Sequence, residues 1–372
     1  MDTRLPNGTN LKVFSSNLNT CRDLKTRAGI LDCLRGFKPD IWLMQEVNVS
    51  TEELDSLVAN LGYTACCNVK SEDETNRGTA IVWKLNLNLE NIYTIEECRV
   101  QTAQLGRLNL MNIYAPSGSE NKFARRELFN QTVMRFCTSV QPNLPLAGGD
   151  FNCVLGRNDA RFNAEKKSCA GLQALVNNFN LTDVFRYFYP NSTEYTFHRA
   201  DSASRLDRFY APQFMLPYIV SVRHLPQAYS DHCIVETNLN VPDLQRLQIP
   251  RKSPRFSYWK LNTGIIDEDF NDNFEIVYNK AREYSADYVD IADWWDQKCK
   301  PMVMHFCKMY SMSLARERKC TKNFLYIQLK NALNNGPYSE VLRIKEDLNK
   351  ILLFEANGIK IRSRHKEVLV GI

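Results

Sequence analysis

Short apolar segments that alternate with helical patterns run from Leu11 to about Asn240, and they constrain the fold more than any other feature. Several are apolar over four or five consecutive positions, as buried strands are; examples are PDIWLMQEV, GTAIVWK, LNLMNIYAP, LPLAGGDFN, SRLDRFYAP and CIVETNL. Between them, apolar residues recur at spacings of three and four in KTRAGILDCLRGF, STEELDSLVANLG and SCAGLQALVNNFN. The second begins with Ser-Thr followed by Glu, which is typical of a helix start. The pattern predicts an α/β layered domain.

Polar residues stand where these apolar segments stop. The positions are Asn17, Glu46, Tyr114, Asp150, Asn152, Asp207, Asp231 and His232. Side chains from the ends of different strands converge at one edge of a sheet, so this repeated placement predicts one common site.

The residue types at these positions indicate an oxygen-rich metal site with a histidine. Carboxylate and amide oxygens suit a hard cation such as Mg²⁺, and the set contains no sulfur, which disfavours zinc. The twelve cysteines form no C-x2-C pair and are expected to be reduced thiols. A histidine oriented by a carboxylate can move a proton, while a metal and polar donors offset charge on a phosphoryl oxygen. The set therefore predicts hydrolysis of a phosphate ester.

The motifs LMQE, NIYAP, GGDFN, RLD and YSDH, in this order, resemble the endonuclease/exonuclease/phosphatase family, which includes DNase I and the apurinic/apyrimidinic (AP) endonucleases. The resemblance covers about residues 11–240. It implies a four-layered α/β sandwich, in which two sheets pack face to face and the site lies at one edge.

The resemblance also implies a role for each matching residue. Glu46 would be the metal carboxylate, with Asn17 and Asp231 beside it, and the cofactor would be Mg²⁺ or alternatively Mn²⁺. Tyr114 and Asn152 would contact the scissile phosphate, and Asp150 would position or deprotonate the attacking water. His232, oriented by Asp207, would be the acid/base or the phosphate-binding imidazole. Asp231 is not expected to orient His232, because adjacent residues at a strand start point to opposite sides.

Within the family, the segment LTDVFRYFYPNSTEYTFHRADSASRLDRFY resembles the endonucleases of LINE-type (non-LTR) retrotransposons. Thr196 and Ser204 match positions near the DNA phosphates in that group, and the hairpin from His198 to Ser204 would approach a DNA groove. The implied reaction is single-strand hydrolysis of DNA to a 3′-hydroxyl.

Charge is distributed unevenly along the chain, whose net charge is +5. Residues 1–240 contain 25 basic and 25 acidic residues, so DNA binding must depend on local clusters. The candidates are Arg157, Arg161, Lys166, Lys167, Arg125 and Arg126. After residue 300 there are 13 basic and 6 acidic residues. This tail would bind an anionic polymer such as the element's RNA, or would simply be a solvated helical surface.

The expected organisation is a domain over 1–240, a proline-rich linker over 241–256 and a mainly helical extension over 257–372. FSYWKLNTGIIDEDF and ANGIKIRSRHKE in the extension resemble the segment that joins endonuclease to reverse transcriptase in LINE polyproteins, but no polymerase signature follows. The chain is expected to be a fragment of such a protein, or a shortened or domesticated copy.

The sequence contains no apolar run of signal-peptide or membrane-helix length, so a nuclear protein, or a cytoplasmic one before import, is expected. Three readings of function remain open. The first is a DNA-nicking endonuclease, and the second is an AP endonuclease or another phosphodiesterase of the same fold. The third is a catalytically idle, domesticated protein that binds nucleic acid.

Overall fold

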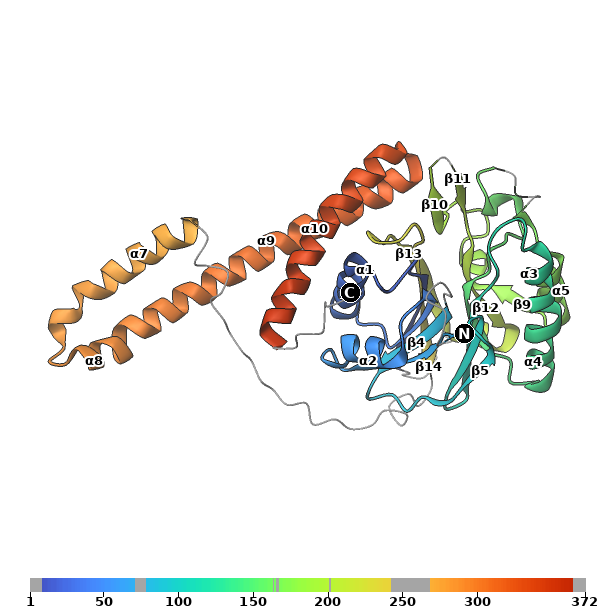
Figure 1. The fold of residues 1–372 in the computed structure, drawn as a ribbon, viewed down its shortest axis with the longest axis horizontal. Coiled ribbons are helices and arrows are strands. Elements are labelled where there is room, and N and C mark those ends of the chain that lie inside the picture. The colour runs from blue at the N-terminus through green and yellow to red at the C-terminus, as the bar shows by residue number, and fades with distance from the viewer. Residues whose placement is uncertain are drawn as a thin grey trace, which may run out of the picture. The chain divides into compact units, whose positions relative to one another are not determined.

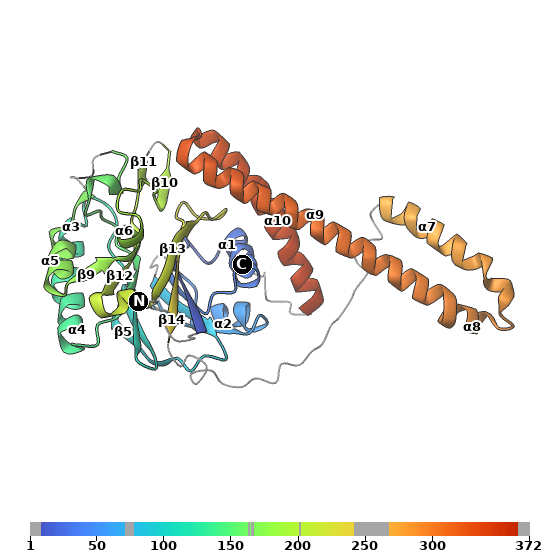
Figure 2. The same ribbon diagram turned by 180° about the vertical axis from the view of Figure 1, so that it is seen from behind.

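The structure, a computed structural model, describes residues 9–70, 78–162, 164, 167–200, 202–241 and 268–363. Two six-stranded sheets dominate the part of the chain up to Val241 (Figures 1 and 2). The expected linker at 241–256 lies outside the described residues, apart from Val241.

The first sheet has the strand order β13, β14, β1, β2, β4, β3. Its strands are β1 (Thr9–Asn17), β2 (Ile41–Val47), β3 (Tyr63–Asn68), β4 (Gly78–Lys84), β13 (Ile219–Leu225) and β14 (Ile234–Val241). β1 pairs with β2 in parallel and with β14 in antiparallel orientation. Helices α1 (Leu24–Gly36) and α2 (Thr51–Ala59) follow β1 and β2. α2 begins at a capping box between Ser50 and Glu53, as the Ser-Thr…Glu pattern predicts.

The second sheet has the strand order β5, β6, β7, β8, β12, β9. Its strands are β5 (Glu90–Glu96), β6 (Val100–Leu105), β7 (Leu108–Tyr114), β8 (Leu146–Asp150), β9 (Leu181–Asp183) and β12 (Asp207–Pro212). The associated helices are α3 (Lys122–Glu127), α4 (Met134–Ser139), α5 (Ala170–Asn178) and α6 (Val184–Phe188). A separate hairpin joins β10 (Phe197–Arg199) to β11 (Ser202–Ser204).

The main core lies between the two sheets and contains side chains of both, such as Leu43 of β2, Leu110 of β7 and Val235 of β14. A second cluster packs the other face of the second sheet against its helices, with Phe129, Phe151 and Leu172 fully buried. Each such side chain contributes about 1.5–3 kcal/mol by its removal from water. The layers are therefore helix, sheet, sheet and helix, and the sandwich predicted from the sequence is confirmed.

The region from residue 268 onwards is helical throughout its described length apart from short connections. Its helices are α7 (Glu268–Glu283), α8 (Ile291–Trp294), α9 (Lys300–Asn335) and α10 (Tyr338–Ser363). Residues up to Ile327 form a compact unit of their own, whereas residues from Gln328 onwards belong to the same unit as the sandwich. The expected single extension is thus divided, because α10 buries an apolar stripe and packs against α1. Among the described residues, no helix is both long enough and apolar enough for a membrane span.

Candidate active site

Strand register brings three of the candidate residues together in the second sheet. Asp150 at the end of β8 is the partner of Tyr114 on β7 and of Asp207 on β12. Residues directly opposite each other on paired strands project to the same face, so these three side chains lie side by side. Gly149 permits this approach, since a Cβ at that position would lie 1.9 Å from the carbonyl oxygen of Ile113.

The first sheet supplies Asn17 and Glu46 from the ends of neighbouring parallel strands. Glu46 has a φ of +58°, and the pairing of β2 with β4 shifts between Gln45 and Val47. A left-handed conformation costs a non-glycine residue about 1–2 kcal/mol, and a bulge redirects the side chain that it carries. This local strain turns Glu46 toward the site, where its Oε1 accepts hydrogen bonds from Asn17 Nδ2 (2.9 Å) and from the Tyr114 hydroxyl (3.2 Å).

Asn17 joins the two sheets. Its side-chain Nδ2 donates to Glu46 Oε1 and also to Asp150 Oδ2, at 2.9 Å, while its Oδ1 accepts from the backbone of Asn19. Asn152, also left-handed with a φ of +48°, donates its backbone N–H to Asp150 Oδ1 and its Nδ2 to Asp150 Oδ2. Asp150 is therefore held by three donors from two residues.

His232 lies in the loop before β14, and its ring faces Asp207. The distance from His232 Nδ1 to Asp207 Oδ2 is 2.9 Å, whereas Asp231 comes no closer to the ring than 4.0 Å, at Nε2. The structure thus brings His232 to Asp207 and not to its neighbour in sequence. Asp150, Asp207 and His232 are buried, and one potential ligand atom from each lies within 4.8 Å of the others.

Burial and neighbouring charges shift the pKa of Asp150 and of His232. Burial raises the pKa of Asp150 to about 7, helped by the charge of Asp207 and opposed by His232. Burial alone would lower the pKa of His232, but the charge and hydrogen bond of Asp207, with Asp150 and Asp231, outweigh it and raise the pKa to about 10. Burial and the charges of Glu46 and Asp150 also raise the pKa of Tyr114 above its usual value. Both shifts favour the protonated imidazole of His232 and the neutral hydroxyl of Tyr114.

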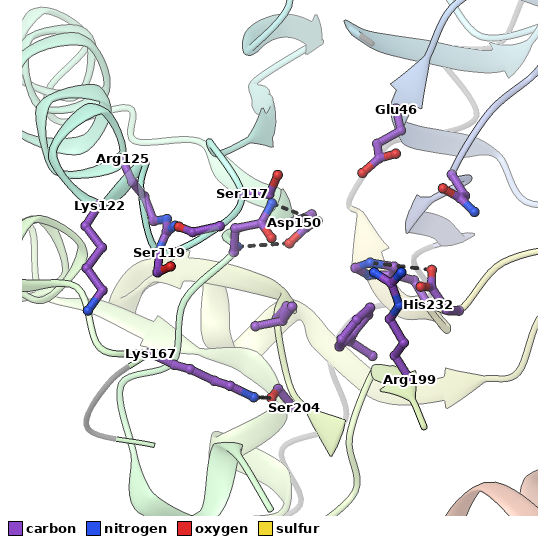
Figure 3. A pocket seen from close by; sticks show the side chains of 16 residues that line it. Glu46, Ser117, Ser119, Lys122, Arg125, Asp150, Lys167, Arg199, Ser204 and His232 are labelled. Atoms are coloured by element: carbon purple, nitrogen blue, oxygen red, sulfur yellow. Dashed lines mark hydrogen bonds and ion pairs between the residues drawn. The ribbon is translucent and has the colours of Figure 1, made fainter. Parts of the chain in front are cut away.

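The site opens into a hollow of about 690 Å³. Acids and His232 line one part of it, and basic and hydroxyl side chains line the opposite part, among them Lys122, Lys167 and Ser119 (Figure 3). Lys122 and Arg199 are exposed, while Lys167 donates to the hydroxyls of Ser202 and Ser204. Lys122 stands at the start of α3, where no strand-end pattern marks it, and it was not among the predicted residues. Arg199 lies in the hairpin from His198 to Ser204, which is the segment predicted to approach a DNA groove.

Four of the residues expected to bind DNA, namely Thr196, Ser204, Arg157 and Arg161, fall in different places. Ser204 lines the hollow. Thr196 is fully buried behind it, where its Oγ1 accepts the backbone N–H groups of Leu206 and Asp207, each at 3.0 Å. Arg157 and Arg161 line a second hollow of about 810 Å³, in which the Arg161 guanidinium lies 6.0 Å from the centre of the Tyr195 ring. Lys166 lies outside the described residues.

A separate cluster of buried ion pairs supports β12 from its other side. Asp159 accepts from Arg186 Nη2 (2.5 Å), Arg205 Nη2 (2.8 Å) and Arg208 Nη2 (3.4 Å), and Asp183 pairs with Arg205 at 2.7 Å. We call these five residues the ion-pair cluster. Burial alone would raise the pKa of Asp159, but Arg208 and Arg205 outweigh it and hold that pKa well below its usual range.

The donor set fits a hard divalent cation. Glu46, Asp150 and Asp231 present carboxylates to the hollow, and Asp207 Oδ1 is buried with no hydrogen-bond partner among the described residues. Asn17 lies behind this surface, where it orients Glu46. A cation bound between His232 and Asp207 would break the hydrogen bond that joins them. The carboxylate oxygens that face the hollow are therefore the better ligands.

Comparison with known proteins agrees with this geometry. The model of the endonuclease/exonuclease/phosphatase family matches residues 13–232. The chain belongs to this family. Membership confirms the family predicted from the sequence and indicates an enzyme of the phosphodiesterase type.

Two solved structures show the same fold as this chain. The AP endonuclease from Archaeoglobus fulgidus is 20% identical, with a TM-score of 0.55, and the match covers 62% of this chain and 100% of that one. The 3′ phosphatase NExo from Neisseria, bound to a product DNA hairpin, is 20% identical, with a TM-score of 0.53 and the same coverage.

A curated relative is similar over nearly the whole chain. The uncharacterized 149 kDa protein of transposon TX1 from Xenopus laevis is 24% identical over 379 residues, which cover 95% of this family member. The chain spans 27% of that relative's length. This match confirms the predicted resemblance to a protein encoded by a transposon.

Proposed function

We propose that this chain is a Mg²⁺-dependent endonuclease that nicks DNA and leaves a 3′-hydroxyl, as in target-primed retrotransposition. The observation that carries the proposal is the convergence of Glu46, Asp150 and the Asp207–His232 pair in one hollow with a basic wall. Hydrolysis of a phosphodiester needs a held water, a proton donor or cation at the phosphoryl oxygen, and a surface for the flanking phosphates.

Mg²⁺, or Mn²⁺ in its place, would be held by Glu46 and Asp231, with Asn17 orienting the Glu46 carboxylate. When bound, the cation would neutralise charge on a phosphoryl oxygen and on the 3′-oxygen that departs as the P–O bond breaks; this oxygen would take up a proton from solvent and become the 3′-hydroxyl. Asn17 donates through one amide nitrogen to both Glu46 and Asp150. It therefore links the position of the metal carboxylate to that of the candidate base.

Asp150 and His232 take different proton roles in this proposal. Asp150 accepts hydrogen bonds from three donors and stands beside the hollow, so it would position the attacking water and take its proton. His232 keeps Nδ1 on Asp207, which leaves Nε2 to donate to a phosphoryl oxygen. Tyr114 and Asn152, which also contact this network, would hold the scissile phosphate.

DNA would lie across the hollow, with backbone phosphates near Lys122 and Ser204 on one side and near Arg199, which lies beside His232, on the other (Figure 3). Arg157 and Arg161 in the second hollow would extend this path. Thr196 would act indirectly, because its hydroxyl holds the backbone of Asp207. Removal of Lys122 or Arg199 is expected to weaken binding on all DNA sequences alike and to reduce its salt dependence.

A nuclear location follows from a DNA substrate, and the excess of basic residues after residue 300 would suit the RNA of a mobile element. The nuclear location and the binding of element RNA are both part of this proposal. Cross-linking of the full chain to element RNA in nuclei would test them together.

Supercoiled plasmid provides the direct test. In Mg²⁺ the chain should convert it to open circles, EDTA should stop the reaction, and a DNA polymerase should extend the nick without prior end repair. His232→Ala should lower the rate by about 100-fold or more. Unchanged nicking by His232→Ala would contradict the proposed mechanism.

Cleavage and binding of DNA duplexes, with and without one abasic site, separate the other proposed functions. An AP endonuclease would cut a duplex with one abasic site far faster than the intact duplex of the same sequence. An idle nucleic-acid-binding protein would shift both duplexes in a gel and cut neither. Metal-dependent cleavage of the intact duplex at the same rate as the duplex with an abasic site would support a nicking endonuclease.

A further inference from the structure

Helix α10 packs onto the part of the sandwich that carries the candidate site. Its residues Val341, Ile344, Leu348, Leu352 and Ala356 are at most 3% exposed and recur at spacings of three and four. This stripe is the buried face of the helix. α10 contacts α1, which follows the turn after Asn17, and both Figures 1 and 2 show the two helices side by side.

Two polar side chains of α10 reach past this apolar stripe to the loop that ends in Asp231 and His232. Lys345 Nζ donates to the carbonyl oxygen of Ser230 at 2.6 Å. Asn349 Nδ2 donates to the carbonyl oxygen of Ala228 at 3.1 Å. The helix is therefore tied to the loop backbone at two points, one of them adjacent to Asp231.

Ser230 also contacts two parts of the candidate site, the end of β1 and the backbone of His232. Its hydroxyl donates to the carbonyl oxygen of Asn17 at 2.8 Å and accepts the backbone N–H of His232 at 3.1 Å. One residue thus connects α10 with the strand end that positions Glu46 and with the imidazole that contacts Asp207.

The positive charge of Lys345 strengthens its hydrogen bond to Ser230, which favours a role for Lys345 in holding this loop in place. A donor that carries a full charge makes a hydrogen bond about twice as strong as a neutral one. Burial lowers the pKa of Lys345, while the charges of Cys233 and Asp231 oppose it. The ammonium is therefore placed where the acidic character of the site compensates part of its desolvation.

We propose that α10 is a positioning element of the candidate active site and that Lys345 is its positioning residue. Through Ser230, Lys345 fixes His232 against Asp207 and the end of β1 beside Glu46. The inference rests on the proposed nicking function and assigns to a helix outside the sandwich a role in the rate of that reaction.

The test compares the full-length wild type with three variants in plasmid nicking at varied DNA concentration. Lys345→Met removes the donor and keeps the side-chain length, Lys345→Arg keeps a charged donor, and Lys350→Met is the matched control on the exposed face of the same helix. Thermal melting of each variant reports whether it is folded.

The expected result is a maximal rate about tenfold lower for Lys345→Met, with the DNA KM within about twofold of wild type, since small displacements of reacting groups act on kcat. Lys345→Arg should recover most of the rate, and Lys350→Met should equal wild type. If Lys345→Met has no cooperative melting transition, Asn349→Ala replaces it, with a loss of about threefold expected.

Three results would overturn the inference: equal rates for wild type and Lys345→Met, the same loss in Lys350→Met, or a change confined to KM. They differ from failure of the proposed function, which would appear as a wild-type chain that does not nick. In that case there would be no wild-type rate with which to compare the variants, and both the proposed function and the role of α10 would be wrong.

Discussion

Two clusters of buried charge adjoin strand β12, and they differ in how their charges are balanced. Asp207 belongs with Asp150 and His232, which we call the acid–histidine cluster, whereas the next residue, Arg208, belongs to the ion-pair cluster. In the ion-pair cluster each of the two carboxylates contacts at least one guanidinium within 3 Å. In the acid–histidine cluster two carboxylates share one imidazole, and Asp207 Oδ1 has no hydrogen-bond partner among the described residues.

The comparison shows that burial alone does not mark a catalytic acid. Asp150 and Asp159 are both nearly inaccessible, with 1% and 2% of their surfaces exposed. Burial raises the pKa of Asp150 to about 7 and the charge of Asp207 adds to this shift, whereas the guanidinium groups of Arg208 and Arg205 outweigh burial at Asp159 and lower its pKa. We therefore expect the ion-pair cluster to stabilise the fold, and we expect the two neighbouring carboxylates of the acid–histidine cluster to lower stability, which is typical of functional sites.

The largest expected effect comes from Asp150→Asn. It should lower the nicking rate by about 1,000-fold or more, because the candidate base is lost. It should leave the free energy of unfolding unchanged or higher, because repulsion with Asp207 is removed. Plasmid nicking and urea unfolding measure the two effects. A large loss of stability would show that Asp150 is structural.

Asp159→Asn should have the opposite effect. Removal of one partner from a buried ion pair leaves uncompensated charge and should lower the free energy of unfolding by about 3–5 kcal/mol. The nicking rate of the folded protein should remain within a few fold of wild type. Asp272→Asn, at an exposed position on α7, is the control and should change neither quantity. If Asp159→Asn abolished nicking while the protein remained as stable as wild type, the division of roles would be wrong.

Gly29→Ala tests how closely α1 must approach the loop before His232. A Cβ on Gly29 would lie 2.0 Å from two atoms of the Tyr229 ring, so the ring or the helix must move. We expect a loss of about 1–3 kcal/mol in stability and a lower nicking rate. Gly36→Ala, in the same helix, is the control, because a Cβ there meets nothing within 4 Å. Equal melting temperatures for both variants would argue against tight packing at this loop.

The smallest effect concerns pH. Because the pKa of Asp159 is lower in the folded chain than the usual value of about 3.9, its contribution to stability is complete above that value and declines as the pH falls below it. The difference in unfolding free energy between wild type and Asp159→Asn should therefore shrink by about 1 kcal/mol between pH 5 and pH 3. Urea unfolding at both pH values measures this difference. A gap that widened toward acid pH would mean that Asp159 is not held as a carboxylate.

The sandwich and the set of converging residues could be predicted because each member stands at an end of an apolar segment: Tyr114 and Asp150 are the last residues of their strands, and Asp207 is the first residue of its strand. Local sequence also indicates that Asp231 and His232 face apart. It does not show that Asn17 donates to Asp150, 133 positions away, since this contact depends on how the two sheets pack. Nor does it reveal the left-handed bulge that turns Glu46, because a bulge is a property of strand pairing.

The place of α10 could not be predicted for a similar reason. An amphipathic helix indicates that one face is covered but not what covers it. The covering surface includes α1, and Lys345 meets Ser230 across 115 positions of sequence. Thr196 resembles a DNA-contacting residue by its motif, yet its hydroxyl is used by the backbone of Leu206 and Asp207.

Asp207→Asn tests the central claim most directly, because Asp207 contacts His232 and lies opposite Asp150 while its immediate neighbour Arg208 belongs to the ion-pair cluster. We expect the purified full-length variant to melt cooperatively near the wild-type temperature and to nick supercoiled plasmid in Mg²⁺ at least about 100-fold more slowly than wild type. Nicking at the wild-type rate by this folded variant would contradict the account.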